Sequence, residues 1–137
     1  MDKKFYFLED GGEMGELMRK KSILLNSPFP MFLFWGKKLK CFYNDAYRPS
    51  LGINGKHPSI LGMSAKEAWP EIWDDISPLL SAVTENGEAI WRENQLIPIF
   101  RNGQLEDVYW TYSYSPVKDA SGNIVGVLTV CSDNTEA

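Results

Sequence analysis

The feature that most constrains the fold is the stretch from Leu105 to Thr135, which reads as two long β-strands joined by a turn. The residues from Val108 to Ser115 alternate with a period of two and are of types that favour strands. Turn-forming residues follow at 119–123, and Ile124 to Val130 is a second β-branched run. Because both strands carry apolar residues on both faces, we expect them in the middle of a sheet rather than at its edge.

Length and composition indicate a single globular domain. The 137 residues are 44% hydrophobic and 13% aromatic, which is enough to bury a core and too much for a disordered chain. The net charge is −4 and no basic stripe is present, so nucleic-acid binding is disfavoured. Lys37, Lys38 and Lys40 form a local cluster that we interpret as a solvated loop.

The cysteine pattern predicts a reducing, cytoplasmic compartment. Cys41 and Cys131 are not part of a CxxC pair, and one possible bridge is no disulfide framework. The residues before Glu9 contain too few apolar side chains for a signal peptide, and no apolar run reaches the ~20 residues of a membrane span. We therefore expect no direct membrane insertion, although the parent protein could be anchored elsewhere.

Helical patterns precede and separate the strands. A broad apolar stripe predicts a first helix at 13–26, which either packs on its own sheet or is shared across a dimer. Further helical segments are expected at residues 44–52, 57–62, 64–69 and 70–86. Within the last segment, Ser77-Pro78 either starts a new helix or kinks a continuous one.

Three more strands are expected, at Met31–Trp35, Leu39–Tyr43 and Ala89–Phe100. A tight turn between the first two places five side chains on one inward face: Phe32, Phe34, Leu39, Cys41 and Tyr43. Asn102-Gly103 is a strong hairpin signal. A two-residue turn there makes four pairs, namely Ile97 with Val108, Gln95 with Trp110, Glu93 with Tyr112 and Trp91 with Tyr114, a register that a bulge would change.

The order of elements predicts an α+β fold, with one five-stranded antiparallel sheet and short helices gathered on one face. Several motifs together resemble those of a PAS domain: Asn44-Asp45-Ala46 after a strand–turn–strand, Leu61-Gly62 before a helix, the Asn102-Gly103 hairpin, Ser115-Pro116-Val117-Lys118-Asp119 with Gly122, and a closing Asp133-Asn134-Thr135 like the family's Asp-x-Thr ending. The strings at 30–36, 43–47, 69–73 and 109–116 are similar to those of a subgroup found in bacterial sensor histidine kinases.

The resemblance implies a profilin-like PAS domain at 28–137, preceded by a flanking segment and helix at 1–27. It implies the strand order 2-1-5-4-3, which would put Cys41 and Cys131 on strands separated by the first strand, roughly 9–10 Å apart and too far to bridge. It also implies a homodimer in a two-component system. Asp133 and Thr135 would transmit a shift to a kinase or another output domain beyond the C-terminal end.

Catalytic and metal sites have little support in the sequence. The chain has one His, and Glu71, Asp74 and Asp75 are best explained as a solvated helix face or first-turn partners of the helix dipole. His57 lies in a loop without a second His, so metal and haem binding are disfavoured. The Asn-Cys-Arg-Phe motif of light-sensing flavin relatives is absent, so flavin is disfavoured too.

The hollow between sheet and helices is the candidate site. The residues that could line it are Phe32, Phe34, Cys41, Tyr43, Trp69, Ile76, Leu80, Glu93, Trp110, Tyr112 and Tyr114. These side chains either fill a densely packed core or surround a ligand. Glu93 either needs a buried partner or ligand group, because a buried unpaired charge is costly, or it points to water near the sheet edge.

Two functions fit these patterns. The first is a sensor module, the input domain of a histidine kinase, that binds a small molecule or relays a conformational change through a homodimer. Ligand binding can bias the output only if the two states bind the ligand unequally. The alternative is a ligand-free module for dimerisation and protein interaction.

Overall fold

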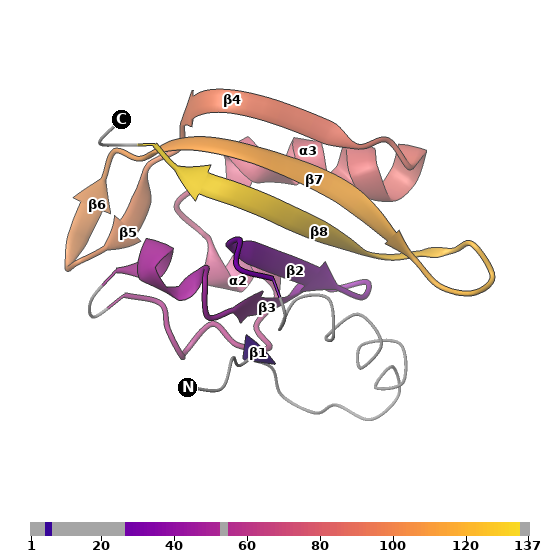
Figure 1. Ribbon diagram of the computed structural model, residues 1–137, viewed down its shortest axis with the longest axis horizontal. Coiled ribbons are helices and arrows are strands. Elements are labelled where there is room, and N and C mark those ends of the chain that lie inside the picture. The colour runs from indigo at the N-terminus through magenta and orange to yellow at the C-terminus, as the bar shows by residue number, and fades with distance from the viewer. Residues whose placement is uncertain (1–4, 7–26, 53–54, 135–137) are drawn as a thin grey trace.

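The long hairpin expected at the C-terminal end forms the centre of the sheet. The computed structural model describes residues 5–6, 27–52 and 55–134. In it, β7 (Tyr109–Lys118) and β8 (Ile124–Asp133) run antiparallel and are joined by a turn that projects from one end of the molecule (Figure 1). The Asp119 carboxylate accepts hydrogen bonds from the backbone N–H groups of Ser121 and Asn123, both at 2.9 Å, which closes the turn.

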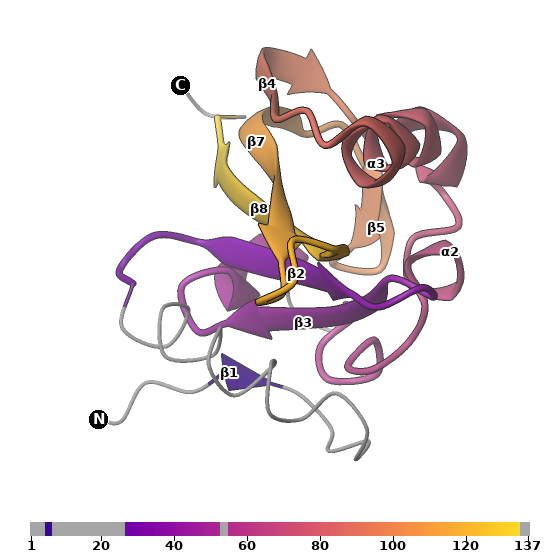
Figure 2. The same ribbon diagram turned by 90° about the vertical axis from the view of Figure 1, so that its right-hand side faces the viewer.

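The strand order agrees with the prediction. The sheet runs β1 (Phe5–Tyr6), β3 (Lys40–Asn44), β2 (Met31–Trp35), β8, β7, β4 (Ile90–Leu96), and every pairing is antiparallel. The last five of these form the order 2-1-5-4-3, and the short β1 extends the edge beside β3. Figure 2 shows the strong twist of this sheet and the helix α3 lying on one face of it.

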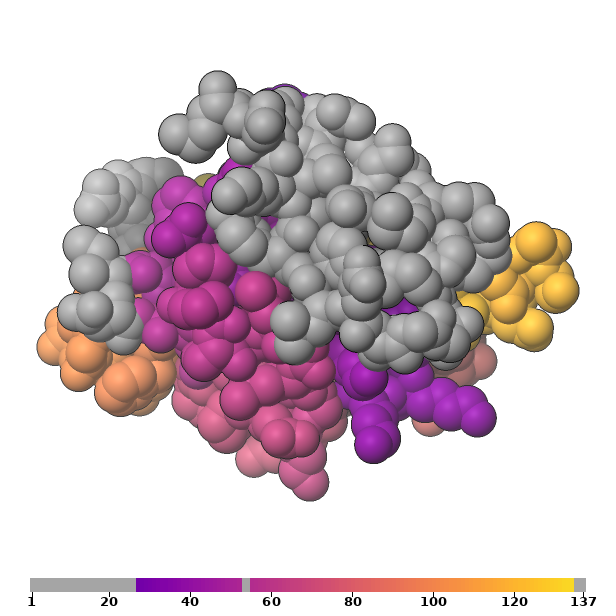
Figure 3. All heavy atoms as spheres, turned by 90° about the horizontal axis from the view of Figure 1, so that it is seen from below, coloured from indigo at the N-terminus to yellow at the C-terminus, as the bar shows by residue number. Residues whose placement is uncertain are grey.

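The strand expected at 89–100 is divided into two strands. Its second part, β5 (Ile99–Arg101), leaves the main sheet and pairs with β6 (Gln104–Glu106) around the Asn102-Gly103 turn, so the hairpin prediction is confirmed. Pro98 separates the parts, because a proline has no N–H to donate to a sheet. The β5–β6 hairpin and the β7–β8 turn lie at opposite ends of the molecule (Figures 1 and 3).

A bulge in β4 changes part of the expected register. Gln95 pairs with Trp110 as predicted, and the Ile97 N–H donates to the Val108 carbonyl at 2.9 Å. The register then shifts between Arg92 and Gln95, so that three pairs replace the expected ones: Arg92 with Tyr112, Trp91 with Ser113 and Ile90 with Tyr114. The predicted pairs of Glu93 with Tyr112 and Trp91 with Tyr114 are therefore wrong.

The helices cover the inner face of the sheet. They are the 3₁₀ turn η1 (Arg48–Leu51), the short α2 (Ala65–Ala68) and α3 (Trp73–Asn86). The helix α3 continues through Pro78 and ends at Gly87, whose φ is +69°. Residues 57–62, expected as a short turn of helix, form hydrogen-bonded turns, one of which is closed by a bond of 3.0 Å from the Ile60 N–H to the Lys56 carbonyl. The helix predicted at 13–26 lies outside the described residues.

Side chains form hydrogen bonds at the starts of two of these helical segments. The Ser64 Oγ accepts from the Glu67 N–H at 3.3 Å, which caps the N-terminus of α2, and donates to the Glu67 carboxylate at 3.0 Å. The Asn44 Oδ1 accepts from the Tyr47 N–H at 3.1 Å at the start of the turn that leads to η1. The Asn44 bond fixes the chain where it leaves β3, and the Ser64 bonds fix the start of α2.

Buried side chains lie on both faces of the sheet. The larger cluster fills the space between sheet and helices, and Phe32, Phe34, Cys41 and Tyr43 all belong to it, as expected. Leu39 is partly buried against this cluster. Cys41 and Cys131 are both free, which agrees with their expected separation by β2. In the part of the chain that the structure describes, no helix has the length and apolar character needed to cross a membrane.

Candidate functional site

A cavity of about 50 Å³ lies between the inner face of the sheet and the helical layer. Strands β2, β7 and β8 form one wall, and α3, the turn before it and the segment from β4 to β5 form the other. The lining residues are Phe32, Phe34, Tyr47, Trp69, Ile72, Ile76, Ile97, Ile99, Trp110, Tyr112, Tyr114, Thr129 and Cys131. Among the described residues, none with a formal charge contributes to this lining.

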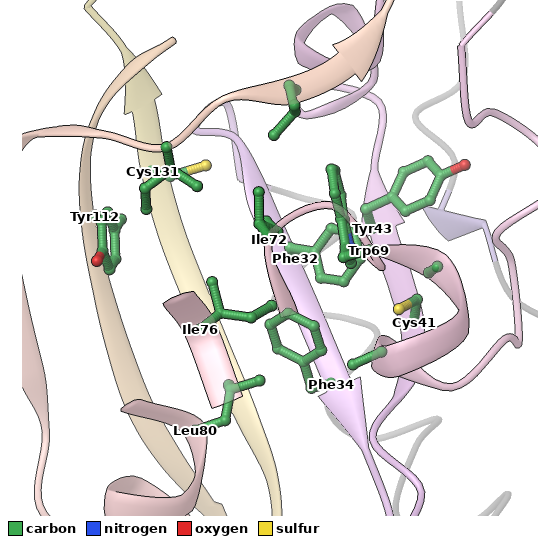
Figure 4. Packing of buried hydrophobic residues seen from close by; sticks show 14 of the residues in the cluster. Phe32, Phe34, Cys41, Tyr43, Trp69, Ile72, Ile76, Leu80, Tyr112 and Cys131 are labelled. Carbon is green, nitrogen blue, oxygen red and sulfur yellow. The ribbon is translucent and has the colours of Figure 1, made fainter. Parts of the chain in front are cut away.

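Seven of the eleven residues expected to surround a ligand line this cavity: Phe32, Phe34, Trp69, Ile76, Trp110, Tyr112 and Tyr114. Three others, Cys41, Tyr43 and Leu80, are buried in the same core but do not reach the cavity. Figure 4 shows Cys41 and Tyr43 on one side of Phe32, with Tyr112 and Cys131 on the other.

Glu93 does not line the cavity. It lies in the bulge of β4, at the edge of the sheet, and its side chain is exposed to solvent. The bulge explains this placement, because one extra residue in a strand turns the following side chains to the other face. The alternative in which Glu93 points to water therefore holds.

Six lining residues were not predicted: Tyr47, Ile72, Ile97, Ile99, Thr129 and Cys131. The two-residue period of β8 was a usable signal for Thr129 and Cys131, since both share one face with the buried Val127. Ile97 could have been found from its expected partner Val108 on the aromatic face. Tyr47 lies in an irregular segment and carries no periodic signal.

Aromatic rings form most of the wall. The Phe32 ring lies 4.8 Å from Phe34, 5.0 Å from Tyr47 and 5.9 Å from Trp69, measured between ring centroids. Tyr112 and Tyr114 lie 5.0 Å apart on the other side. Tilted and edge-on ring pairs at these distances are mutually attractive and hold the wall in one arrangement.

The polar groups of the wall stay uncharged near neutral pH. Burial raises the pKa of the Tyr112 and Tyr114 hydroxyls. Burial, followed by the charge of Asp133, raises the pKa of the Cys131 thiol to about 12. A thiol this strongly protonated is a poor nucleophile. Within the described ranges, no group of three or more His, Cys, Asp or Glu side chains is placed to hold a metal ion.

Two polar groups of the wall differ in their bonding. The indole N–H of Trp110 donates to the Ile97 carbonyl at 3.2 Å, which fixes the ring. The Thr129 hydroxyl is buried and has no hydrogen-bond partner in the part of the chain that the structure describes. Because almost all buried polar groups are paired, this hydroxyl needs an explanation.

A charged cluster connects the β5–β6 hairpin to the end of β8. Arg101 donates to the Glu106 carboxylate at 2.8 Å, to the Ser50 carbonyl at 2.9 Å and to the Asp133 carboxylate at 3.0 Å. Burial alone would lower the pKa of Arg101, but its bonds to Glu106 and Asp133 raise the pKa above its ordinary value. Asp133 was predicted to transmit a signal, but its partner Arg101 was not predicted. Thr135, the other residue of that prediction, lies outside the described residues.

Asn134, the residue that follows β8, bonds to two other strands of the sheet. The Asn134 N–H donates to the Tyr109 carbonyl at 2.7 Å, and its side-chain amide donates to Asn94 at 3.0 Å and Thr111 at 2.6 Å. Asn94 belongs to the bulge of β4. The bulge therefore supplies a bonding partner for the residue that leaves β8.

Two polar pairs surround the turn at 55–62. The Tyr43 hydroxyl and His57 Nδ1 lie 2.6 Å apart, and burial, with the charge of Arg48, lowers the pKa of His57. Lys56 forms an ion pair of 3.0 Å with Glu71, which also accepts from the Phe100 N–H at 2.9 Å. Glu71 thus bridges two segments, whereas the sequence predicted a solvated helix face or a first-turn partner of the helix dipole. Figure 3 shows this turn at the surface between the β2–β3 and β5–β6 hairpins.

Solved structures of similar architecture have low sequence identity to this chain. An RNA-binding Light-Oxygen-Voltage receptor is 14% identical with a TM-score of 0.59, over 98% of this chain and 39% of the receptor. A sensory box sensor histidine kinase from Vibrio cholerae is 16% identical with a TM-score of 0.59, over 88% of this chain and 97% of the other. VqmA bound to DPO is 18% identical with a TM-score of 0.59, over 85% of this chain and 57% of VqmA.

These likenesses show the fold alone, and this chain spans less than two thirds of the receptor and of VqmA. A comparison with curated proteins found no match. The family model described as PAS fold matches residues 31–137, which include all five strands of the expected order. On this match, and with the strand order and cavity described above, the chain belongs to the PAS family.

Proposed function

We propose that this chain is the sensory input module of a bacterial sensor histidine kinase and relays a change in its cavity to an output domain beyond residue 137. One observation carries the proposal: Arg101 joins the end of β8 to the β5–β6 hairpin, whose first residue, Ile99, lines the cavity. Two supports come from outside the geometry, namely the similar kinase structure and the strings at 30–36 and 109–116.

The relay needs two arrangements of the hairpin that a ligand distinguishes. A molecule in the cavity would press on Ile99, and Arg101, two residues further along the same short strand, would carry that displacement to Asp133. A ligand shifts such an equilibrium only by the difference between its affinities for the two states, and about 5.5 kcal/mol of difference takes a population from 1:99 to 99:1.

The test uses the full-length parent protein and its autokinase activity, measured as phosphate transfer from ATP. Arg101→Gln and Asp133→Asn should each change basal activity in the same direction, and the double variant should go no further than either single one. Lys38→Gln is the matched control, because Lys38 is an exposed lysine in the β2–β3 turn. Wild-type activity in all three cluster variants would reject the relay. A parent protein without an ATP-binding kinase domain after Ala137 would reject the histidine-kinase assignment.

The small size of the cavity favours a second candidate, a ligand-free module for homodimerisation. A volume of about 50 Å³ is roughly a third of the ~150 Å³ in an engineered cavity that takes benzene. The same size supports our proposal that neither haem nor flavin binds here. Native mass spectrometry with an absorbance scan above 350 nm tests both statements. A bound chromophore would contradict the proposal that neither haem nor flavin binds. A dimer without any small molecule would favour the ligand-free module.

A further inference from the structure

The unpartnered hydroxyl of Thr129 is the starting point. Thr129 lies in β8, opposite Phe32 on one side and Tyr114 on the other, and its exposed fraction is 7%. No described residue bonds to its Oγ1, and that atom is closed to solvent. A valine has the same shape and no hydroxyl, so the polar atom carries a cost that no described residue offsets.

The cavity can present this hydroxyl to a bound molecule. Thr129 belongs to the lining, and rotation about its χ1 moves the hydroxyl between staggered positions, one of which is the position that the methyl group now holds. The neighbouring polar groups are the thiol of Cys131 and the hydroxyl of Tyr114, and burial raises the pKa of both. The wall therefore offers hydrogen bonds from neutral groups and no counter-charge for an ion.

Size and shape restrict the molecule further. A volume of about 50 Å³ excludes anything larger than a few non-hydrogen atoms unless the wall moves. Four of the lining residues have flat aromatic rings, namely Phe32, Phe34, Trp69 and Trp110. Flat, uncharged molecules gain most from such surfaces, because ring faces stack and an ion would lose its hydration without a partner.

We propose that the cavity binds a flat, uncharged molecule smaller than benzene, and that the Thr129 hydroxyl selects this molecule by forming one hydrogen bond to it. This inference rests on the proposed sensory function and names the chemical class of its ligand. Thr129 is then the residue that distinguishes a polar ring from an apolar ring of equal size. The aliphatic and Phe side chains of the lining contribute shape and contact area.

Three probes of five non-hydrogen atoms test the inference: pyrazole, which is flat, neutral and hydrogen-bonding; thiophene, which is flat, neutral and has no strong hydrogen-bonding group; and propionate, which is an anion. Binding is followed by methyl and amide chemical shifts in NMR titrations of the wild-type chain. We expect saturable shifts around the cavity with pyrazole and none with propionate. Saturable binding of propionate at the cavity would overturn the requirement for a neutral ligand.

Two variants separate the hydroxyl from the shape of the side chain. Thr129→Val should weaken pyrazole binding about tenfold or more and leave thiophene binding unchanged, while Thr129→Ser should retain pyrazole binding. Equal affinity of pyrazole for wild type and Thr129→Val would overturn the role of Thr129 and leave ligand sensing in place. Failure of every probe to bind the wild type would overturn the ligand class, whereas the relay through Arg101 is judged separately by kinase activity.

Discussion

Replacing Thr129 by Val should stabilise the ligand-free protein. The buried hydroxyl has no partner among the described residues, and an unsatisfied buried polar group costs about 1–3 kcal/mol. Valine keeps the shape of the side chain and favours strands, so we expect a gain of about 1–2 kcal/mol in the free energy of unfolding. With an unfolding entropy of about 2.1 cal/mol/K per residue over 137 residues, that gain raises Tm by about 3–7 °C.

A second threonine of the same sheet provides the matched control. The Thr111 hydroxyl lies on the other face of β7, where it accepts from the Asn94 N–H at 3.2 Å and from the Asn134 amide at 2.6 Å. Thr111→Val removes both bonds and leaves two donors without their acceptor. We therefore expect a loss of about 0.5–1.5 kcal/mol, opposite in sign to the change at Thr129.

The assay is urea denaturation of both variants and the wild type, followed by circular dichroism, with equal m-values as the check that the folded states are comparable. Opposite changes in midpoint support the reasoning. A Thr129→Val protein that is less stable than the wild type would refute it, because the hydroxyl would then have a bonding partner in the ligand-free protein.

Three further outcomes are expected. The hydrogen bond from Arg101 holds the pKa of Glu106 below its ordinary value of 4.5. This pair therefore stabilises the fold above pH 4.5, and its contribution is lost as the pH falls through the depressed pKa. Arg101→Met should flatten the acid side of a stability–pH curve measured by urea denaturation. Gly126→Ala should lower the free energy of unfolding by roughly 1–3 kcal/mol, seen as a lower Tm, because the added Cβ would lie 2.6 Å from a carbonyl oxygen of β2. Burial raises the pKa of the Cys41 and Cys131 thiols, so iodoacetamide should modify neither in the native protein and both in guanidinium, as read by mass spectrometry.

The central strands could be predicted from the periodic patterns of the sequence. The alternation in β7 follows from burial of one side chain in two, so Trp110, Tyr112 and Tyr114 face the core as their spacing indicates. The order of the strands came from the family resemblance, because pairing between distant segments leaves no local pattern. The same limit applies to the 32-residue separation of Arg101 and Asp133, whose contact exists only once β5 has left the main sheet.

The register of β4 could not be predicted because a bulge has almost no local signature. The positive φ of Asn94, +49°, is the clearest mark, since asparagine tolerates this conformation better than most residues. The division of the strand was better marked, because Pro98 cannot donate to a central ladder. The position where β5 leaves the sheet could thus be predicted from the sequence, but the bulge that turns Glu93 to solvent could not.

The position of Pro98 gives the hairpin its place in the proposed relay. Because the chain leaves the main sheet there, β5 turns Ile99 into the cavity and, two residues later, brings Arg101 to the end of β8. A strand with period two directs both side chains to the same face, so a displacement of one moves the other. Had the third strand run uninterrupted to Phe100, Ile99 would have remained a ladder residue at the sheet edge, and Asp133 would lack the cation that connects it to the cavity wall.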